Sequence, residues 1–203
     1  GKPEMYFFPS QMNNHGGEFP FTFFGLNPGV TREQVRDALM RFDKGDNHIL
    51  SLSRAYRLRA DTGWDVPPGT LHAPGSLCTY EPQVASDVFA MYQSVLYFDH
   101  VVPQELLWKD TPPERIGDYE ALLDRIHWEI NLDPDFERNR FMAPIPAAPL
   151  EETEPEGYAD EWICYRSDAV CAKRLTVLPG RAVTIRDEAA YGFILLQGHG
   201  LAN

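Results

Sequence analysis

A histidine stands in the rigid sequence PPGTLHAPGS, and a glutamate follows it nine residues later. Pro67 and Pro68 fix their φ angles, whereas Gly69 permits the turn that proline cannot make. The sequence therefore predicts that His72 is held rigidly at the entry of a strand. Neutral imidazole is a ligand for zinc, iron or manganese. Because HAPGS is expected to fold the chain back, Glu81 is predicted to lie on the next strand and to face His72.

The pair by itself does not establish a site. For a lone histidine and a lone glutamate, the commoner arrangement is an imidazole bonded to a loop and a carboxylate in solvent. The sequence around them must therefore decide between the two interpretations.

The elements predicted around this pair are mostly short strands. Aromatic-rich runs over 4–8 and 19–26 are typical of strands, and further strands are expected at 54–60, 64–66, 76–81 and 88–98. Thr31 followed by Gln34 predicts the capped start of a helix that reaches Phe42, and a short helix is expected at 46–52. This pattern is typical of an antiparallel sandwich or barrel.

The second half of the chain has a different pattern. Apolar residues at helical spacing predict one helix within 110–133, and a linker rich in Pro and Glu is expected over 144–157. Three strand-like runs follow within 172–200. No short-period repeat is present.

The frame P-x-G-x-x-H, formed by Pro67, Gly69 and His72, resembles the second conserved motif of cupins. The stretch VPPGTLHAPGSLCTYEPQVASD is similar in particular to type I mannose-6-phosphate isomerases. The opening GKPEM strengthens the resemblance, which covers roughly residues 1–100. The last forty or so residues look like the start of a second, weaker cupin unit.

The resemblance implies an all-β fold with a few helices, in which a cupin double-stranded β-helix (jelly-roll) barrel precedes the start of a second cupin-like β unit. The expected parts are a metal-binding cupin barrel lacking its first strands over 1–109, a helix and acidic linker over 110–159, and the partial second unit over 160–203.

The resemblance also implies roles for individual residues. Glu4 and His72 are expected to bind a divalent metal, with zinc the first candidate, and Lys2 to lie near the substrate. Glu81 is expected at the reacting carbons, and Asp87 matches the acidic residue of the family's Ser-Asp step. The family has two further ligands, a Gln and a His, on an earlier strand, and the chain is expected to begin after them.

The implied function is a metal-dependent isomerase that interconverts an aldose and a ketose. Met91 stands where the family has an Arg, and a thioether cannot bind a phosphate. The expected substrate is therefore a neutral sugar, or a sugar phosphate held by other cations such as Arg54, Arg57 or Lys109. The alternative is a non-catalytic metal- or sugar-binding cupin. A metal-dependent oxygenase ranks last, because the chain has no His-x-His pair.

Composition excludes other classes of protein. Thirty Asp and Glu against eighteen Lys and Arg give a net charge of −12, which disfavours nucleic acid as a partner. No apolar run reaches the length of a membrane span, so no membrane partner is expected. Three cysteines without CxxC spacing predict reduced thiols and a cytoplasmic location. His15, in the sequence NNHGG, is predicted to be an exposed loop residue.

Overall fold

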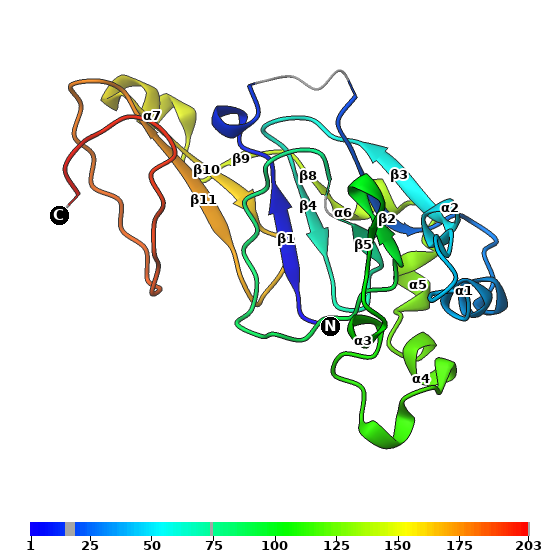
Figure 1. The fold of residues 1–203 in the computed structure, drawn as a ribbon. Helices are drawn as coiled ribbons and strands as arrows, with labels where there is room; N and C mark the ends of the chain where they lie inside the picture. Colours follow the sequence, from blue (N-terminus) through cyan, green and yellow to red (C-terminus); the bar gives the residue numbers. More distant parts are fainter. Residues whose placement is uncertain (15–18, 74, 203) are drawn as a thin grey trace.

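The computed structural model describes residues 1–14, 19–73 and 75–202, so His15 lies outside the described residues. The described chain is a mixed α/β structure with 23% helix and 22% strand (Figure 1). Its strands are β1 (Glu4–Phe7), β2 (Phe21–Leu26), β3 (Ser53–Arg57), β4 (Gly63–Val66), β5 (His72–Ala73), β6 (Val95–Leu96), β7 (His100–Val101), β8 (Phe141–Met142), β9 (Ile145–Pro146), β10 (Tyr158–Cys164) and β11 (Ala172–Val177). Its helices are α1 (Arg32–Leu39), α2 (Ile49–Leu52), α3 (Gln104–Leu107), α4 (Tyr119–Leu123), α5 (Trp128–Asn131), α6 (Phe136–Arg140) and α7 (Leu150–Glu156), with short 3-10 turns at Ser10–Met12, Tyr97–Asp99 and Pro113–Arg115.

The predicted cupin barrel is wrong. The strands form four small antiparallel sheets of 2–3 strands, and none of the four is closed or curled into a barrel. Their orders are β1-β4-β8 (the first sheet), β3-β2-β5 (the second sheet), β11-β10-β9 (the third sheet) and β6-β7. Several strands are only two residues long, and the segment beside β1 makes isolated bridges instead of a strand. Pro82 lies in that segment and has no N–H to donate to a ladder.

The first and second sheets pack face to face around an aromatic core. Tyr6 of β1 and Trp64 of β4 contact Phe24 of β2, with ring centroids 5.8 and 5.1 Å apart. Phe136 of α6 stacks on Phe24 at 5.9 Å. Burial of these large rings supplies much of the stabilisation that holds the two sheets together.

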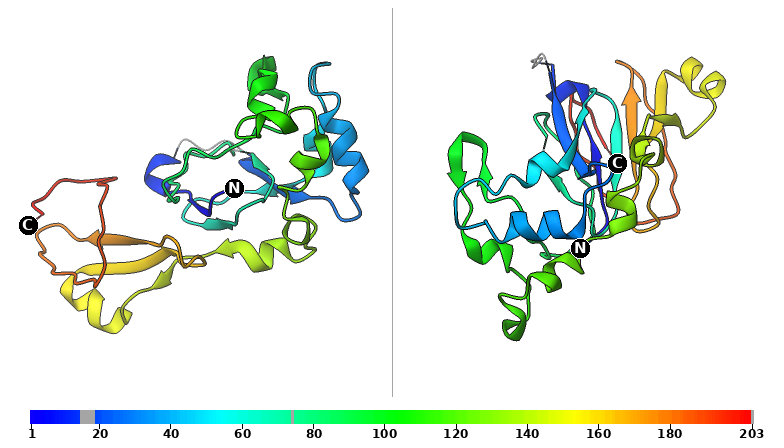
Figure 2. Two further views of the ribbon diagram at one scale, coloured as in Figure 1. Left: turned by 90° about the horizontal axis from the view of Figure 1, so that it is seen from below. Right: turned by 90° about the vertical axis from the view of Figure 1, so that its right-hand side faces the viewer.

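Strand β1 is buried on both faces. Its alternate residues Met5 and Phe7 pack with Ile163 and Cys164 of β10 on the side away from the second sheet. The first sheet therefore lies between the second sheet on one side and the third sheet on the other. Figure 2 shows the third sheet with α7 on one side of the molecule and α1 with α4 on the opposite side.

Helix α1 confirms the capping prediction. Thr31 and Gln34 form a capping box, in which the Thr31 side chain accepts from Gln34 N and the Gln34 side chain accepts from Thr31 N. Val35 and Leu39 are buried in an apolar cluster that also contains Leu122 of α4. This cluster supports the turn that carries His72, because Leu71 packs against it.

The single helix predicted within 110–133 is divided into shorter elements. Gly117 has φ +92, and Asp118 then caps α4 by accepting from the N–H groups of Glu120 and Ala121. His127 caps the separate helix α5 by accepting from Ile130 N. Apolar spacing predicted the helical state of Tyr119, Leu122, Leu123 and Ile130, but Ile116 and Ile126 lie outside the helices, because these local caps divide the stretch.

The predicted linker and terminal strands also differ from the structure. The stretch 144–157 contains β9 and α7, and only the first of the three strand-like runs within 172–200 forms a strand, β11. A strand needs a hydrogen-bonded neighbour, and within the described chain residues 178–202 have none in a sheet. No helix of the described residues has the length and apolar character needed to cross a membrane.

Candidate functional site

Strand β1 brings Glu4 to the end of the aromatic core. Side chains alternate along a strand, so Glu4 shares a face with Tyr6, which packs against Phe24 of the second sheet. The Glu4 side chain is 11% exposed. A carboxylate this well buried is costly unless a partner compensates its charge.

The partner is His72, which is placed by the turn predicted from the PPG sequence. Thr70 N donates to Pro67 O at 3.1 Å, and Gly69 adopts φ +78, which favours glycine. His72 then begins β5 and pairs with Phe24 of β2. The turn therefore delivers the imidazole from the second sheet toward β1 of the first sheet.

The two side chains meet. His72 Nε2 lies 3.3 Å from Glu4 Oε2, and the imidazole keeps 29% of its surface exposed. His72 Nδ1 lies 2.9 Å from Thr70 O and donates to it, so Nε2 is the nitrogen presented to the carboxylate. The Tyr6 ring packs against the imidazole edge-on, with centroids 5.9 Å apart.

Lys2 lies on the other side of Glu4 from His72. Its Nζ lies 3.6 Å from Glu4 Oε1 and donates to Ser86 O at 3.0 Å. Glu4 is therefore bracketed by an ammonium group and an imidazole. An ammonium group has three N–H donors, so Lys2 keeps capacity for a further acceptor.

Glu81 arrives on a segment that runs antiparallel to β1. Bridges join Phe7 to Tyr80 and Glu4 to Gln83, and this register places Glu81 opposite Tyr6. Glu81 is thus on the face that carries Glu4, one alternate position further along. Lys2, Glu4, His72 and Glu81 are called the charged cluster below.

Burial and mutual charge shift the pKa values of the cluster in different directions. Burial alone would raise the pKa of Glu4, but the hydrogen bond and charge of His72, together with Lys2, hold it below its usual value. Burial opposes protonation of His72, yet Glu4 and the Thr70 carbonyl outweigh it and raise its pKa. Glu81 lies at the surface, yet partial desolvation and the Glu4 charge raise its pKa, although His72 and Lys2 partly oppose the shift. Glu81 is therefore the carboxylate of the cluster that accepts a proton more readily.

Asp87 and Met91 lie apart from this cluster. Asp87 is exposed, and its backbone carbonyl accepts from Lys109 Nζ at 3.2 Å. Among the described residues, no hydrogen bond or ion pair joins its carboxylate to the cluster. Met91 packs against the apolar cluster of α1 and α4, and its N–H donates to Leu106 O at 3.0 Å. Of the five predicted site residues, the structure thus brings four together.

The Glu4–His72 pair fits two positions of a zinc site. Two ligand atoms 3.3 Å apart, each about 2.1 Å from one ion, would subtend about 104°, close to the tetrahedral angle. The bond from Nδ1 to a backbone carbonyl is also the usual support of a metal-binding histidine. Catalytic zinc has three protein ligands, however, and the described residues contain no group of three or more His, Cys, Asp or Glu that could hold a metal ion. Glu4 and His72 therefore supply two of the three protein ligands that a catalytic zinc needs.

Two residues of the site were missed by the sequence analysis. Tyr6, which covers the His72 ring, could have been found from its alternation with Glu4 on one strand. Asn131, which binds the turn before His72, carries no local signal, because a single Asn in an apolar helical pattern is uninformative.

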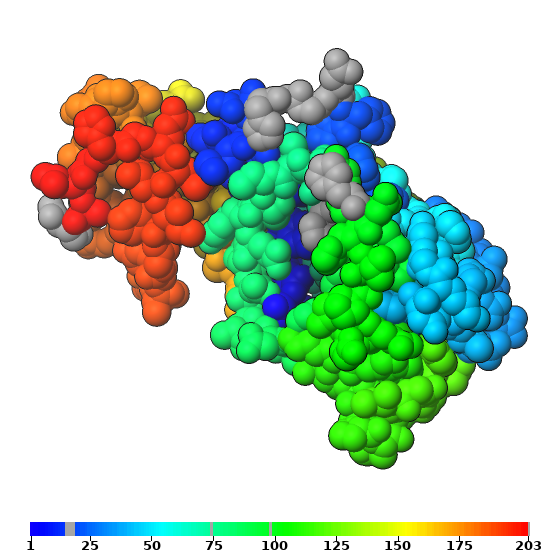
Figure 3. All heavy atoms as spheres, in the orientation of Figure 1, coloured from blue at the N-terminus to red at the C-terminus, as the bar shows by residue number. Residues whose placement is uncertain are grey.

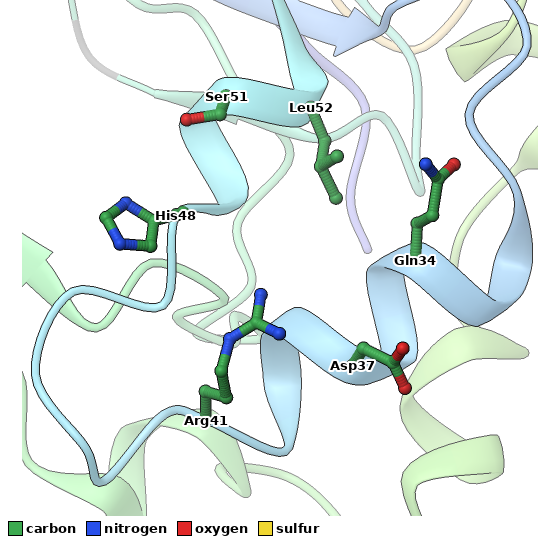
Figure 4. A pocket seen from close by; sticks show the side chains of 6 residues that line it. All are labelled: Gln34, Asp37, Arg41, His48, Ser51 and Leu52. Atoms are coloured by element: carbon green, nitrogen blue, oxygen red, sulfur yellow. The ribbon is translucent and has the colours of Figure 1, made fainter.

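The cluster is open to solvent. In Figure 3 the dark blue atoms of the N-terminal residues lie at the floor of a hollow bordered by blue-green and green segments. Other hollows lie elsewhere on the surface. One lies between α1 and α2, where Arg41 and Leu52 point into the space between the helices (Figure 4). A second is lined by Arg32, Glu33, Arg36 and Glu120. Neither contains a residue of the charged cluster.

Comparisons with known proteins do not assign a family. No protein-family model matches the chain, and searches of curated proteins and of solved structures find no significant match. The resemblance to type I mannose-6-phosphate isomerases therefore stays a prediction.

The packing of the turn before His72 against the α4–α5 connection can be tested by substitution of Gly69. A Cβ at Gly69 would lie 2.8 Å from Arg125 O and 2.9 Å from His127 N, whereas a Cβ at Gly29 would meet nothing within 4 Å. Both glycines have positive φ, so Gly29→Ala is expected to cost about 1–2 kcal/mol from backbone strain alone. Gly69→Ala is expected to lower the free energy of unfolding by at least about 1 kcal/mol more, because backbone must shift. Urea unfolding measures both losses, and equal losses would show that the turn is not pressed against the α4–α5 connection.

Proposed function

We propose that the chain is a metal-dependent isomerase that interconverts an aldose and a ketose, similar in its site to type I mannose-6-phosphate isomerases. The observation that carries the proposal is the meeting of Glu4 and His72 beside Lys2 and Glu81. Two of these residues come from the start of the chain and two from positions 72 and 81. The sequence motifs on which the resemblance depends are therefore neighbours in space.

Glu81 is the proposed base. Interconversion of an aldose and a ketose moves one proton between C1 and C2 and a second proton between O1 and O2, so that the hydroxyl and the carbonyl exchange places. Glu81 removes the proton from one carbon and returns it to the other, the second proton passes between the two neighbouring oxygens of the enediolate through solvent, and the carboxylate is regenerated in each turnover. Its raised pKa suits this exchange, because a very weak base would not hold the proton.

Glu4 and His72 are the proposed ligands of a divalent cation, with zinc the first candidate. When bound, such a cation supplies a Lewis acid for the sugar oxygens. Lys2 orients a substrate hydroxyl or carbonyl through a free N–H while its other contacts hold it between Glu4 and Ser86. Tyr6 keeps the imidazole in place.

The surroundings favour an unphosphorylated sugar over a sugar phosphate. Arg54 donates to the backbone carbonyls of Asn131 and Asp133, and Arg57 lies over the ring of Phe19, 5.5 Å from its centroid. Two of the cations that would replace the family Arg are thus engaged elsewhere, and Met91 packs in an apolar cluster. Lys109, the third, binds the Asp87 carbonyl.

The alternative is a non-catalytic protein that binds a metal or a sugar. Two observations favour it. The described residues offer only Glu4 and His72 as metal ligands at this site, and Met91, at the position of the family Arg, packs against an apolar cluster. In either case we propose a cytoplasmic protein, because Cys78, Cys164 and Cys171 are free thiols. The net charge of −12 supports a small-molecule partner instead of nucleic acid.

Zinc binding tests the proposed ligands. The full chain, freed of metal with a chelator, is expected to bind zinc in isothermal titration calorimetry. Glu4→Gln and His72→Asn are each expected to weaken binding by at least about tenfold. His100→Asn, which changes an exposed histidine of β7, should leave the affinity unchanged. Wild-type affinity in both cluster variants would show that zinc binds elsewhere.

Turnover tests the proposed base. In D₂O with zinc present, the protein is expected to wash deuterium into C1 or C2 of an aldose such as mannose, followed by ¹H NMR. Glu81→Gln should lower kcat by about 10²–10⁴-fold with little change in KM, because it removes the group that moves the proton. Glu105→Gln, an exposed change on α3, is the control.

Two results would count against this assignment. Undiminished exchange in Glu81→Gln would remove the base from the proposal. Binding of the sugar without exchange in the wild type would favour the non-catalytic alternative. A parallel assay with mannose 6-phosphate decides whether the phosphate is tolerated.

A further inference from the structure

Asn131 is a fully buried polar residue at the end of α5, and every polar group of its side chain is bonded. Its exposed fraction is 0%. Its Oδ1 accepts from Leu71 N at 2.7 Å, and its Nδ2 donates to Gly69 O and His127 O, both at 2.8 Å. A side chain bonded in this way is fixed in one orientation.

These bonds hold the residue that precedes His72. Leu71 N is bound by Asn131, and Leu71 O accepts from Gly25 N of β2 at 2.7 Å. Strand β5 has only two residues, His72 and Ala73, so its ladder is too short to fix its own position. The position of His72 therefore depends on what holds Leu71.

The backbone of Asn131 is bound by a residue of the second sheet. Its backbone carbonyl accepts from Arg54 Nη2 at 3.0 Å, and Arg54 lies on β3 of the second sheet. Gly69 O also accepts from His127 N at 3.0 Å, which ties the same turn to the start of α5. The end of α5 thus connects the second sheet to both sides of the turn.

We infer that Asn131 is a positioning residue for His72. By fixing Leu71 N and Gly69 O it sets where the imidazole stands, so that Nδ1 reaches Thr70 O and Nε2 faces Glu4. Among the described residues, the Asn131 side chain bonds to Leu71, Gly69 and His127 and makes no hydrogen bond to Glu4 or to the imidazole, so it acts through the turn. The consequences for zinc affinity and turnover depend on the proposed function, whereas the geometric claim does not.

Asn47 offers a matched control. It is also 0% exposed, and its Nδ2 donates to Tyr92 O at 2.8 Å while its Oδ1 accepts from Ser94 N at 3.4 Å. It therefore joins two segments through a buried side-chain amide, as Asn131 does. Its partners Tyr92 and Ser94 lie outside the charged cluster.

The test compares Asn131→Ala with Asn47→Ala by ¹H–¹⁵N NMR of the His72 ring, in the metal-free full chain at a pH where the imidazole is protonated. Both ring N–H groups then have an acceptor, Nδ1–H in Thr70 O and Nε2–H in Glu4, and wild type and Asn47→Ala are expected to show both as slowly exchanging signals. Asn131→Ala is expected to lose the slowly exchanging Nδ1–H signal, because the bond to Thr70 O is no longer held in register. A His72 spectrum unchanged in folded Asn131→Ala would overturn the inference.

A measurement on the wild type keeps the inference testable if Asn131→Ala does not fold. The Leu71 amide is expected to exchange with D₂O at least about 100-fold more slowly than an unprotected amide, because it is bonded to a buried acceptor. Exchange at the unprotected rate would contradict the inference. Where zinc binds, Asn131→Ala should also weaken it by about tenfold or more, whereas Asn47→Ala should not. Absence of zinc binding in the wild type would end the proposed function and leave the NMR comparison valid.

Discussion

The contact between Glu4 and His72 is the interaction on which the site depends. It joins the first residue of β1 to the first residue of β5, so it connects two sheets that are otherwise held together by aromatic packing. A carboxylate that is 11% exposed requires a compensating charge, and the imidazole and the Lys2 ammonium supply it. Glu4 is therefore stabilised by Lys2 and His72, and a shift of either cation would leave the buried carboxylate less well compensated.

The rest of the fold serves to bring the two ends of this contact together. Burial of β1 on both faces leaves it no freedom to shift, because its alternate residues pack into two different apolar clusters. His72, at the other end of the contact, is fixed by the turn before it. Gly69 allows this turn to lie close to the α4–α5 connection, and the Asn131 side chain accepts from Leu71 N. A short strand is thus positioned from outside its own sheet.

Features that depend on neighbouring residues or on a recognisable motif could be predicted from the sequence. The capping box at Thr31, the proline-glycine turn before His72 and the meeting of Glu4 with His72 all follow from residues a few positions apart or from a motif. The arrangement of the sheets could not be predicted in this way. Closure of a barrel depends on pairing between strands far apart in the sequence, and the segment with Pro82 does not pair as a continuous strand. The helix predicted within 110–133 failed for the opposite reason, since caps at Asp118 and His127 outweigh apolar spacing.

The most direct test of the central contact is a double-mutant cycle with Glu4→Gln and His72→Asn in metal-free protein. The raised pKa of His72 gives stability that is present below its ordinary value of 6.5 and is lost as pH rises through the folded pKa. The lowered pKa of Glu4 gives stability that is present above 4.5 and is lost on acidification. The coupling energy from urea unfolding at pH 6 should therefore be about 1 kcal/mol, and it should decline toward pH 9. A coupling energy of zero at pH 6 would contradict the contact and the site built on it.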